Sequence, residues 1–482
     1  MVAASTPSVS QRPRVAAVRL DPWAMAAALV VFATMALRPG ILDDGDTYWH
    51  LAVGAWMLDH RQVLDRDIFS FTAAGTRWVS HEWLSEVLMA GAWRLGGWSG
   101  LVVLFAAAAA SAFGLQARAM ARHLPPLSLV LALSLAFALS AKGLLTRPHV
   151  LALPLMVGWT VAMLRAREAG RAPHPALALL IVLWANLHGS FIFAFVLAGA
   201  FGLEALTTAR PDARWRVVRD WGLFGACCAV AATATPHGVA GLIHPFTITG
   251  MKTLGVIDEW RPTAFGTLGP FEIALLTTVS VCLYRGVKVP PVRLALLILL
   301  THMALQHQRH QAVLAMVAPL LLAEPVATAL AGRAARTFQG RLVAPALALV
   351  LLGAMVARLA TPIVRGDGEN TPVTALAKIP PQLLSRPVLN SYGFGGYVIL
   401  AGGKVFIDGR ADMYGDAAVV RYIDVLAGRP AAVEQAFAQH PIAWTLLEPG
   451  AKLVKVMDAR PGWRRLYADR YAVIHVREDA LR

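Results

Sequence analysis

The sequence predicts a polytopic α-helical membrane protein of about eleven transmembrane helices, followed by a C-terminal extracytoplasmic α/β domain. Three observations lead to this fold class. Of the 482 residues, 57% are hydrophobic and only 15% are charged, a balance typical of chains embedded in lipid. Apolar runs of membrane-spanning length recur up to residue 359. Beyond that residue, short strand patterns alternate with helix patterns.

The membrane-spanning segments follow from the requirement of roughly 20 consecutive apolar residues per helix. The segments near 174–187 and 291–306 are short, so each could be tilted or only half embedded. The first run follows an arginine-bearing tail, as in a signal peptide, but it is long enough to span and further runs follow, so we expect a retained helix. We therefore expect transmembrane helices near 22–38, 99–117, 126–142, 148–164, 174–187, 190–207, 220–235, 270–285, 291–306, 311–330 and 342–359.

The net charge of +15 comes largely from clusters of lysine and arginine between the apolar runs. Such clusters orient a membrane protein, because short basic loops stay in the cytoplasm, and we expect no nucleic-acid partner. This rule places the N-terminus in the cytoplasm and, with an odd number of spans, the C-terminal domain outside it. We expect a multi-pass protein of the cytoplasmic (inner) membrane. The clusters lie in the N-terminal tail and at 118–122, 165–171, 210–219, 285–293 and 333–341.

The expected domains are a cytoplasmic tail at 1–21, a transmembrane domain at 22–359 and the extracytoplasmic α/β domain at 360–482. The transmembrane domain has long outer loops at 40–98 and 236–269, and loops of this size usually carry function. In the α/β domain we expect strands near 388–390, 396–401, 404–408, 442–447, 465–468 and 471–477, with helices near 416–427, 431–440 and 450–458.

The first outer loop contains two amphipathic stretches, 46–60 and 80–95, which are rich in tryptophan and suit helices lying in the membrane interface. Asp43, Asp44 and Asp46 gather where the first of these helices should begin, and the helix dipole helps keep them ionised. His50 follows Asp46 by one turn on the same face. Asp46, Asp44 and His50 could therefore act in catalysis, or the aspartates could only cap the helix.

Ionisable residues elsewhere also favour the outer side. Glu82 and Glu86 share one helical face, towards a polar cavity or towards water. Glu259 could join Asp44 and Asp46 in binding a divalent metal, Mg²⁺ or Mn²⁺. Most histidines before the C-terminal domain map outside, which indicates a reaction centre there, or else caps at helix ends. Candidates for binding an anionic group such as phosphate, or for anchoring helices to lipid headgroups, are Arg147, His149, His188, His237, Arg309 and His310.

The C-terminal domain carries a glycine-rich segment, 392–397, before one expected strand, and Asp408 and Arg410 at the end of another. No βαβ unit follows that would make the glycines a nucleotide loop. We expect a tight turn that shapes an acceptor groove, with Tyr392, Asp408 and Arg410 facing the first outer loop. Alternatively, Asp408 and Arg410 pair only with each other.

The segment Asp44-Gly45-Asp46-Thr47-Tyr48-Trp49-His50-Leu51 resembles the acidic first-loop motif of GT-C membrane glycosyltransferases, most nearly the catalytic subunit of oligosaccharyltransferase. Residues 392–397, followed by Ile407-Asp408-Gly409, are similar to the region around the Trp-Trp-Asp-Tyr-Gly signature of that subunit. The Trp-Trp-Asp portion is absent here, as is the second acidic pair at 143–146, so the resemblance supports the class better than an Asn-x-Ser/Thr acceptor.

The resemblance implies a GT-C-like glycosyltransferase that moves a sugar from a polyprenyl-phosphate-linked donor to an acceptor at the outer membrane face. Its partners would be the lipid bilayer, that donor, and a glycan, lipid or protein acceptor. Asp46 or Asp44 would orient or deprotonate the acceptor hydroxyl. A transporter or flippase for a lipid-linked saccharide is the second hypothesis, although it should place ionisable residues near mid-membrane and show repeats. A non-catalytic assembly subunit is the third, and it should tolerate neutral first-loop aspartates.

Overall fold

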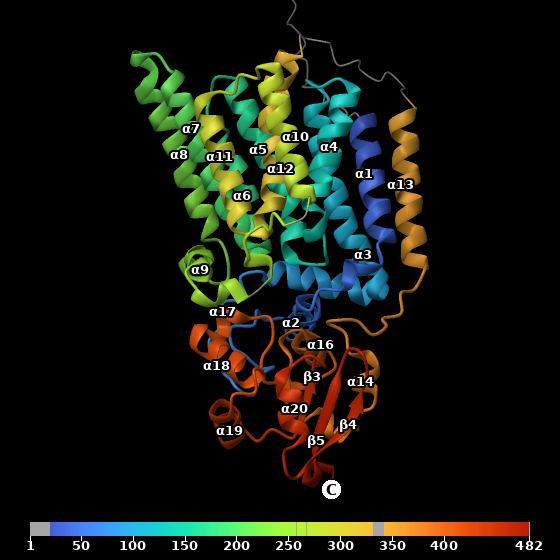
Figure 1. The fold of residues 1–482 in the computed structure, drawn as a ribbon. Helices are drawn as coiled ribbons and strands as arrows, with labels where there is room; N and C mark the ends of the chain where they lie inside the picture. Colours follow the sequence, from blue (N-terminus) through green and yellow to red (C-terminus); the bar gives the residue numbers. More distant parts are fainter. Residues whose placement is uncertain (1–19, 257, 267, 331–341, 482) are drawn as a thin grey trace, which may run out of the picture.

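The structure is a computed structural model that describes residues 20–256, 258–266, 268–330 and 342–481. The predicted tail up to residue 19 and the basic loop at 333–341 lie outside the described residues. A bundle of long helices stands over a smaller domain that contains a β-sheet, and the first outer loop lies at their junction (Figure 1).

Every predicted transmembrane segment overlaps a helix of the structure. Proline begins α1, α4, α5, α10 and α11, because a first-turn residue needs no amide hydrogen and its φ suits a helix. The helices are α1 Pro22–Leu37, α3 Trp83–Met120, α4 Pro126–Ser140, α5 Pro148–Glu168, α6 Leu179–Leu187, α7 Ile192–Thr208, α8 Arg214–Ala232, α10 Pro270–Arg285, α11 Pro291–Gln306, α12 Gln311–Ala329 and α13 Val343–Ala360.

Six helices among the described residues are long and apolar enough to cross a membrane: Trp83–Met120, Pro126–Gly143, Pro148–Glu168, Gly189–Thr208, Gln308–Ala329 and Val343–Ala360. Shorter apolar helices occur at Pro22–Leu37, Pro175–Leu187, Val239–Thr249 and Pro291–Gln306. The chain is therefore a multi-pass membrane protein, and the number of about eleven crossings stays a prediction.

Small residues let the first helices pack closely. A Cβ on Gly114 of α3 would lie 3.1 Å from the carbonyl oxygen of Ala24 in α1, so only glycine allows this approach without a shift. At Gly96 and Gly97 the backbone of α3 leaves helical geometry, and the helix bends. Its first part, which carries Glu86, runs across the lower end of the bundle rather than along it (Figure 1).

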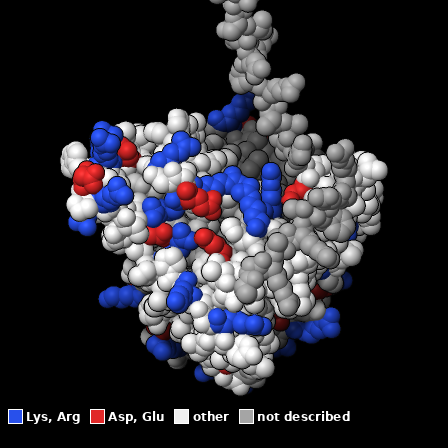
Figure 2. Space-filling view, turned by 90° about the horizontal axis from the view of Figure 1, so that it is seen from above, with Lys and Arg blue, Asp and Glu red and all other residues white. Residues whose placement is uncertain are grey.

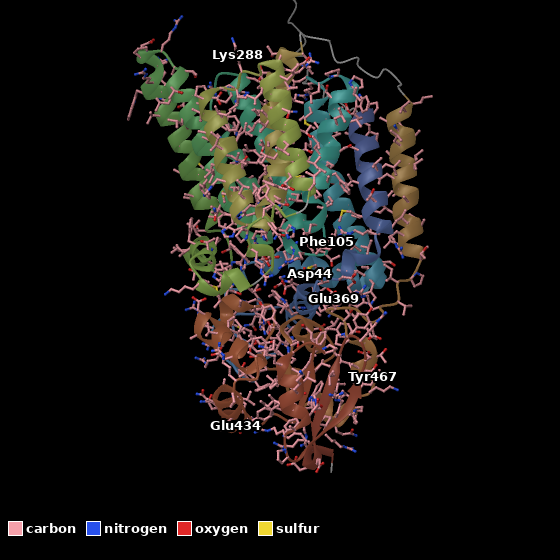
Figure 3. All side chains as sticks on the ribbon, viewed as in Figure 1. Asp44, Phe105, Lys288, Glu369, Glu434 and Tyr467 are labelled. Carbon is pink, nitrogen blue, oxygen red and sulfur yellow. The ribbon has the colours of Figure 1, made fainter. Side chains whose placement is uncertain are left out.

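The end of the bundle away from the sheet domain is basic. Figure 2 looks down on this end and shows lysine and arginine gathered there, with a few carboxylates between them. Lys288, between α10 and α11, lies at this end, whereas Asp44 lies at the junction with the sheet domain (Figure 3). The opposite ends of the bundle thus carry the basic loops and the acidic motif, and the orientation inferred from them stays a prediction.

The C-terminal domain is built on a five-stranded mixed sheet of order β2-β1-β3-β5-β4. Strand β1 runs parallel to β2 and β3, and β5 runs antiparallel to β3 and β4. The strands are β1 Pro387–Asn390, β2 Lys404–Val405, β3 Trp444–Leu447, β4 Trp463–Ala468 and β5 Val473–Arg477. The helices around them are α14 Val373–Ala377, α15 Pro381–Leu384, α16 Gly395–Leu400, α17 Ala411–Tyr414, α18 Asp416–Leu426, α19 Pro430–Gln439 and α20 Lys452–Asp458.

One predicted strand was wrong. Residues 396–401 form most of helix α16, although Tyr397, Val398 and Ile399 suit a strand. The reason is tertiary: a Cβ on Gly396 would overlap the carbonyl oxygen of Gly45, so the glycine lets α16 lie backbone to backbone on the first outer loop. Packing against that loop overrides the local strand preference.

The first outer loop and the C-terminal domain share one hydrophobic core. Helix α2 (Asp46–His60) buries Trp49 and Val53 against residues of the sheet domain that include Phe394. Further along the loop, the backbone amide of Phe71 donates to the carbonyl of Val405 across 3.2 Å, which extends the edge of the sheet. The loop therefore joins the two parts of the molecule.

Candidate active site

A cavity of about 630 Å³ opens where the bundle meets the C-terminal domain. Membrane helices contribute apolar residues to its lining, Leu153, Phe193 and Met303 among them. Other parts of its wall are polar. The predicted site residues that line it are Asp44, Asp46, His50, Arg147, His149, His188, Glu259, Arg309, His310 and Tyr392.

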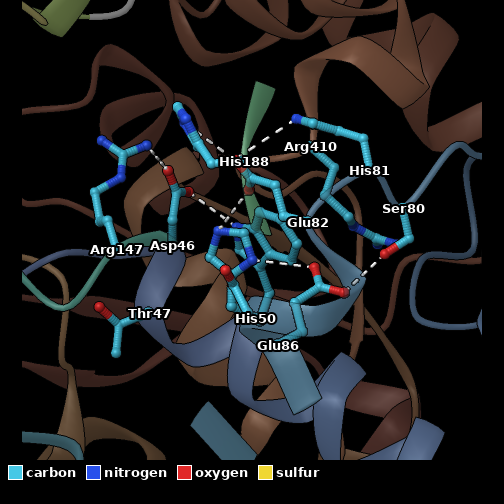
Figure 4. Close-up of polar contacts among 12 residues, drawn as sticks. Asp46, Thr47, His50, Ser80, His81, Glu82, Glu86, Arg147, His188 and Arg410 are labelled. Carbon is cyan, nitrogen blue, oxygen red and sulfur yellow. Dashed lines mark hydrogen bonds and ion pairs between the residues drawn. The ribbon is translucent and has the colours of Figure 1, made fainter. Parts of the chain in front are cut away.

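Three carboxylates converge on one guanidinium at this polar wall. Arg147 precedes α5 and lies 2.5 Å from Asp46 Oδ2 through Nη2 and 3.5 Å from Asp44 Oδ2 through Nη1 (Figure 4). It also contacts Glu259, and Arg309 pairs with that carboxylate across 3.3 Å. The cluster thus contains three carboxyl groups and two guanidinium groups, so one negative charge is in excess.

Burial decides which carboxyl group holds a proton. Burial raises the pKa of Asp46 to about 7, against the opposing effect of Arg147, and burial also raises the pKa of Asp44. Burial also acts to raise the pKa of Glu259. The positive charges of Arg147 and Arg309 outweigh this effect and lower the pKa to about 2. The pKa of Asp46 thus lies near neutral pH, whereas that of Glu259 lies far below it.

Asp44 and Asp46 have different local roles. The backbone amide of Asp46 donates to Asp44 Oδ1 across 2.8 Å, so Asp44 supports the start of α2. Asp46 makes no capping hydrogen bond to the helix; its Oδ1 accepts from Trp49 Nε1 across 3.0 Å. The capping alternative thus fits Asp44 in part and does not describe Asp46.

His50 lies at the cavity with Asp46, but it bonds to other groups. Its Nδ1 lies 3.1 Å from Glu86 Oε1, and its Nε2 lies 3.6 Å from Glu82 Oε2 (Figure 4). Its ring lies against Trp49, with 3.6 Å between centroids. Burial lowers the pKa of His50 well below its usual range, so the ring is neutral.

Glu82 is the centre of a second polar group. His188 Nε2 lies 3.3 Å from its Oε1, and the backbone amide of Ser190 donates to His188 Nδ1, which leaves the ring proton on Nε2 facing Glu82. Burial, and then the neighbouring Glu86, raise the pKa of Glu82 well above its usual range. Glu82 and Glu86 thus both lie within a polar cluster inside the protein. Of the two surroundings predicted for them, a polar cavity or water, the structure agrees with the first.

Three predicted residues lie elsewhere. His237 Nε2 lies 3.2 Å from the carbonyl oxygen of Ser80, away from the cavity wall. Asp408 and Arg410 form a bidentate pair, with Nε–Oδ1 and Nη2–Oδ2 distances of 2.8 and 2.7 Å, and both are buried. Arg410 also lies 2.9 Å from Asp67 of the first outer loop. The pair therefore joins the first outer loop to the C-terminal domain. Of the three predicted acceptor residues, Tyr392 alone lines the cavity.

Other residues that line the cavity were not among the predicted site residues. Lys142 lies at the cavity, 2.6 Å from Gln308 Oε1 through its Nζ, and it stands in the same loop as Arg147, which is the signal that could have found it. Trp260 lies under Arg309, with 4.3 Å from the guanidinium carbon to the ring centroid. His81 also lines the cavity, whereas His244 and Asp412 lie next to it. The three residues place one possible ligand atom each within 4.8 Å of one another, and so could hold a metal ion.

The chain has a GT-C-like fold, as the first-loop motif predicted, and its likeness to solved structures concerns the fold alone. The predicted nearness to oligosaccharyltransferase stays a prediction. No family model matches the chain, and no curated protein matches its sequence. Among solved structures, the chain is similar to the arabinofuranosyltransferase AftD from Mycobacteria, with a TM-score of 0.50 and 17% identity over 94% of this chain. The chain spans 41% of the length of that structure. ArnT from Cupriavidus metallidurans, bound to undecaprenyl phosphate, gives a TM-score of 0.49 and 13% identity, with 94% of this chain and 97% of that chain covered.

Proposed function

We propose that the protein is a membrane glycosyltransferase that moves a sugar from a polyprenyl-phosphate-linked donor to an acceptor at the outer face of the cytoplasmic membrane. One observation carries the proposal: a single cavity is lined both by apolar residues of membrane helices and by half-buried aspartates and cations. A lipid-linked sugar has the same division, with an apolar chain, an anionic phosphate and a polar sugar. The shared fold with a membrane arabinofuranosyltransferase agrees with this chemistry.

The donor phosphate would bind among Arg309, Arg147 and the histidines of the cavity. Trp260 and Glu259 hold the side chain of Arg309, which is 29% exposed. Its guanidinium N–H groups can therefore donate hydrogen bonds to a ligand. His149 Nε2 lies 2.8 Å from the carbonyl oxygen of Gly143, which leaves Nδ1 for a second partner. His188 and His310 complete the set that lines the cavity. His237 is left out because it lies elsewhere.

Asp46 would act as the general base. It takes the proton of the acceptor hydroxyl, whose oxygen attacks the sugar carbon that carries the phosphate. The bond from that carbon to the phosphate oxygen breaks, and its electron pair leaves with the polyprenyl phosphate. Arg309 and Arg147 offset the charge that develops on the leaving phosphate. His50, neutral and bonded to Glu86, would position the start of α2 through Trp49.

A Mg²⁺ or Mn²⁺ ion at Asp44, Asp46 and Glu259 stays a prediction. Carboxylate oxygens suit such hard cations. The guanidinium of Arg147, however, contacts all three carboxylates, and an ion there would have to displace it. In the proposed reaction, arginine side chains therefore supply the positive charge that stabilises the leaving phosphate, and no metal ion is required.

The acceptor would enter from the side of the C-terminal domain. Tyr392 lines the cavity from a turn that the glycines of residues 392–397 allow, and Gly409 lies against Asp46 and Trp49. Asp408 and Arg410 would support this turn from the interior rather than touch the acceptor. With the N-terminus in the cytoplasm, this side faces out of the cell membrane.

The test is the pair of variants Asp46→Asn and Asp44→Asn. Asparagine keeps the size and most hydrogen bonds of aspartate, so we expect folded protein with transfer reduced about 10²–10⁴-fold for Asp46→Asn, the usual effect of losing a general base. The measurement is transfer from a radiolabelled polyprenyl-linked donor pool to endogenous acceptor in membranes with matched expression.

Asp43→Asn is the matched control. Asp43 belongs to the same motif, but its side chain is 59% exposed and pairs with Arg365 across 2.9 Å, outside the cavity. It should keep transfer within about threefold of wild type. If Asp44→Asn, Asp46→Asn and the double variant all stay within about threefold as well, the protein is a transporter or an assembly subunit instead.

A further inference from the structure

Three segments that are far apart in sequence bring a histidine, a histidine and an aspartate to one point. His81 lies in the first outer loop, His244 in α9 (Val239–Thr249), and Asp412 in α17 of the C-terminal domain. Their possible ligand atoms all lie within 4.8 Å of one another. None of the three was part of the predicted metal site, and of the three His81 alone lines the cavity of the proposed active site.

The distances suit ligands of one ion. Two atoms each about 2.1 Å from a tetrahedral zinc ion lie about 3.4 Å apart. His244 Nε2 and Asp412 Oδ2 are separated by 3.2 Å. The rings of His81 and His244 have centroids 4.7 Å apart and are tilted by 52°, so they lie side by side without stacking.

His81 presents a buried ring nitrogen that could bind an ion. Its Nδ1 atom is buried and has no hydrogen-bond partner among the described residues, which is a cost unless a ligand satisfies it. Its other nitrogen, Nε2, lies 3.6 Å from Glu82 Oε1. An ion bound at Nδ1 would satisfy that buried nitrogen.

The carboxylate of Asp412 is held by a hydrogen bond from the first outer loop. Trp78 Nε1 donates to its Oδ2 across 3.2 Å. This indole comes from the first outer loop, so one loop supplies both a ligand and the group that orients another. A carboxylate and two imidazoles are a donor set suited to Zn²⁺ and unlike the all-oxygen sets of Mg²⁺.

We propose that His81, His244 and Asp412 bind one Zn²⁺-class ion, which fastens the C-terminal domain and the outer loop that contains α9 to the first outer loop. Three protein ligands leave a fourth position for water. The ion stabilises the junction that forms the floor of the active-site cavity, because His81 and Glu82 line that cavity. This inference does not depend on which reaction the cavity performs.

The experiment uses the full chain, purified in detergent and passed through a chelating resin. Metal content is measured per chain for the wild type, His244→Gln and Asp412→Asn. We expect about one zinc per wild-type chain and at least fivefold less in each variant. The matched control is His237→Gln, a histidine close by in sequence that bonds to a backbone carbonyl outside the cluster, and it should keep the ion.

A second measurement guards against variants that fail to fold. Stripping the wild-type protein with a chelator should lower its Tm, and Zn²⁺ alone should restore it, while Asp412→Asn should show neither effect. Replacing the ion with Co²⁺ should give the visible absorption bands of a tetrahedral site. A wild-type chain that holds no zinc, binds none when Zn²⁺ is added and keeps its Tm after chelation would overturn the proposal. Variants that keep the full zinc content would overturn it as well.

Discussion

The Nη2 atom of Arg147 lies 2.5 Å from Asp46 Oδ2, so the residue before α5 is paired with the first residue of α2. This contact fixes the acidic motif of the first outer loop to the membrane bundle. The same guanidinium reaches Asp44 and Glu259, and it therefore sets both the position and the charge of the proposed base. Several expected results follow from this arrangement and its neighbours.

Arg147→Lys should lower sugar transfer at least about tenfold while leaving the protein inserted in the membrane. Lysine keeps the positive charge, but its single ammonium group cannot contact three carboxylates as the planar guanidinium does. Transfer in membranes at matched expression measures the effect. Arg94→Lys is the control, because Arg94 pairs with Asp59 at an exposed site, and wild-type transfer in Arg147→Lys would contradict the assigned role.

Gly409→Ala should lower transfer with little loss of folded protein. A Cβ at this position would overlap the carboxylate of Asp46 and lie 2.7 Å from Trp49 Nε1, so the side chain of the base must move. Displacing a reacting group by about 1 Å can cost about 10²-fold in rate. The comparison variant is Gly366→Ala, where nothing lies within 4 Å of the added methyl group. Equal sugar transfer by the two variants would show that close packing of Gly409 against Asp46 does not affect the reaction.

Arg410→Leu should destabilise the junction of loop and domain by about 3–5 kcal/mol, because it leaves the buried carboxylates of Asp408 and Asp67 without a cation. The measurement is thermal unfolding in detergent, together with limited proteolysis of the C-terminal domain. Arg429→Leu provides the control: its pair with Asp424 is mostly exposed on the arginine side, at 69%, and it should change stability by less than about 0.5 kcal/mol. Similar unfolding curves for both variants would refute the structural role of Arg410.

A fusion of alkaline phosphatase to Arg482 should be active, because the C-terminal domain is expected outside the cytoplasm. A fluorescent protein at the same point should stay dark. The matched fusion ends the chain at Lys288, which lies at the basic end of the bundle, and should show the reverse pattern (Figure 3). A fluorescent fusion at Arg482 would place the active-site cavity on the cytoplasmic side and end the proposal of an outer-face acceptor.

Local features of the sequence were enough for most of the helices. A long apolar run with proline at its start predicts a membrane helix without knowledge of its neighbours, and the predicted segments near 148–164 and 126–142 begin where α5 and α4 begin. The stretch 46–60 likewise matches α2, because its acidic start and amphipathic pattern are local signals. Fold class and the acidic motif could thus be inferred before any coordinates.

Contacts between distant segments were decided only by the tertiary structure. The segment 396–401 has the residues of a strand, yet it is helical because Gly395 and Gly396 allow it to pack on Ile407–Asp408 and on the first outer loop. The convergence of Asp46, Arg147 and Glu259 on one point has no signature in spacing, since each lies more than a hundred residues from the next. Charges so distant in sequence meet only when packing brings their helices together, and burial there, rather than residue type, raises the pKa of Asp46 to about 7.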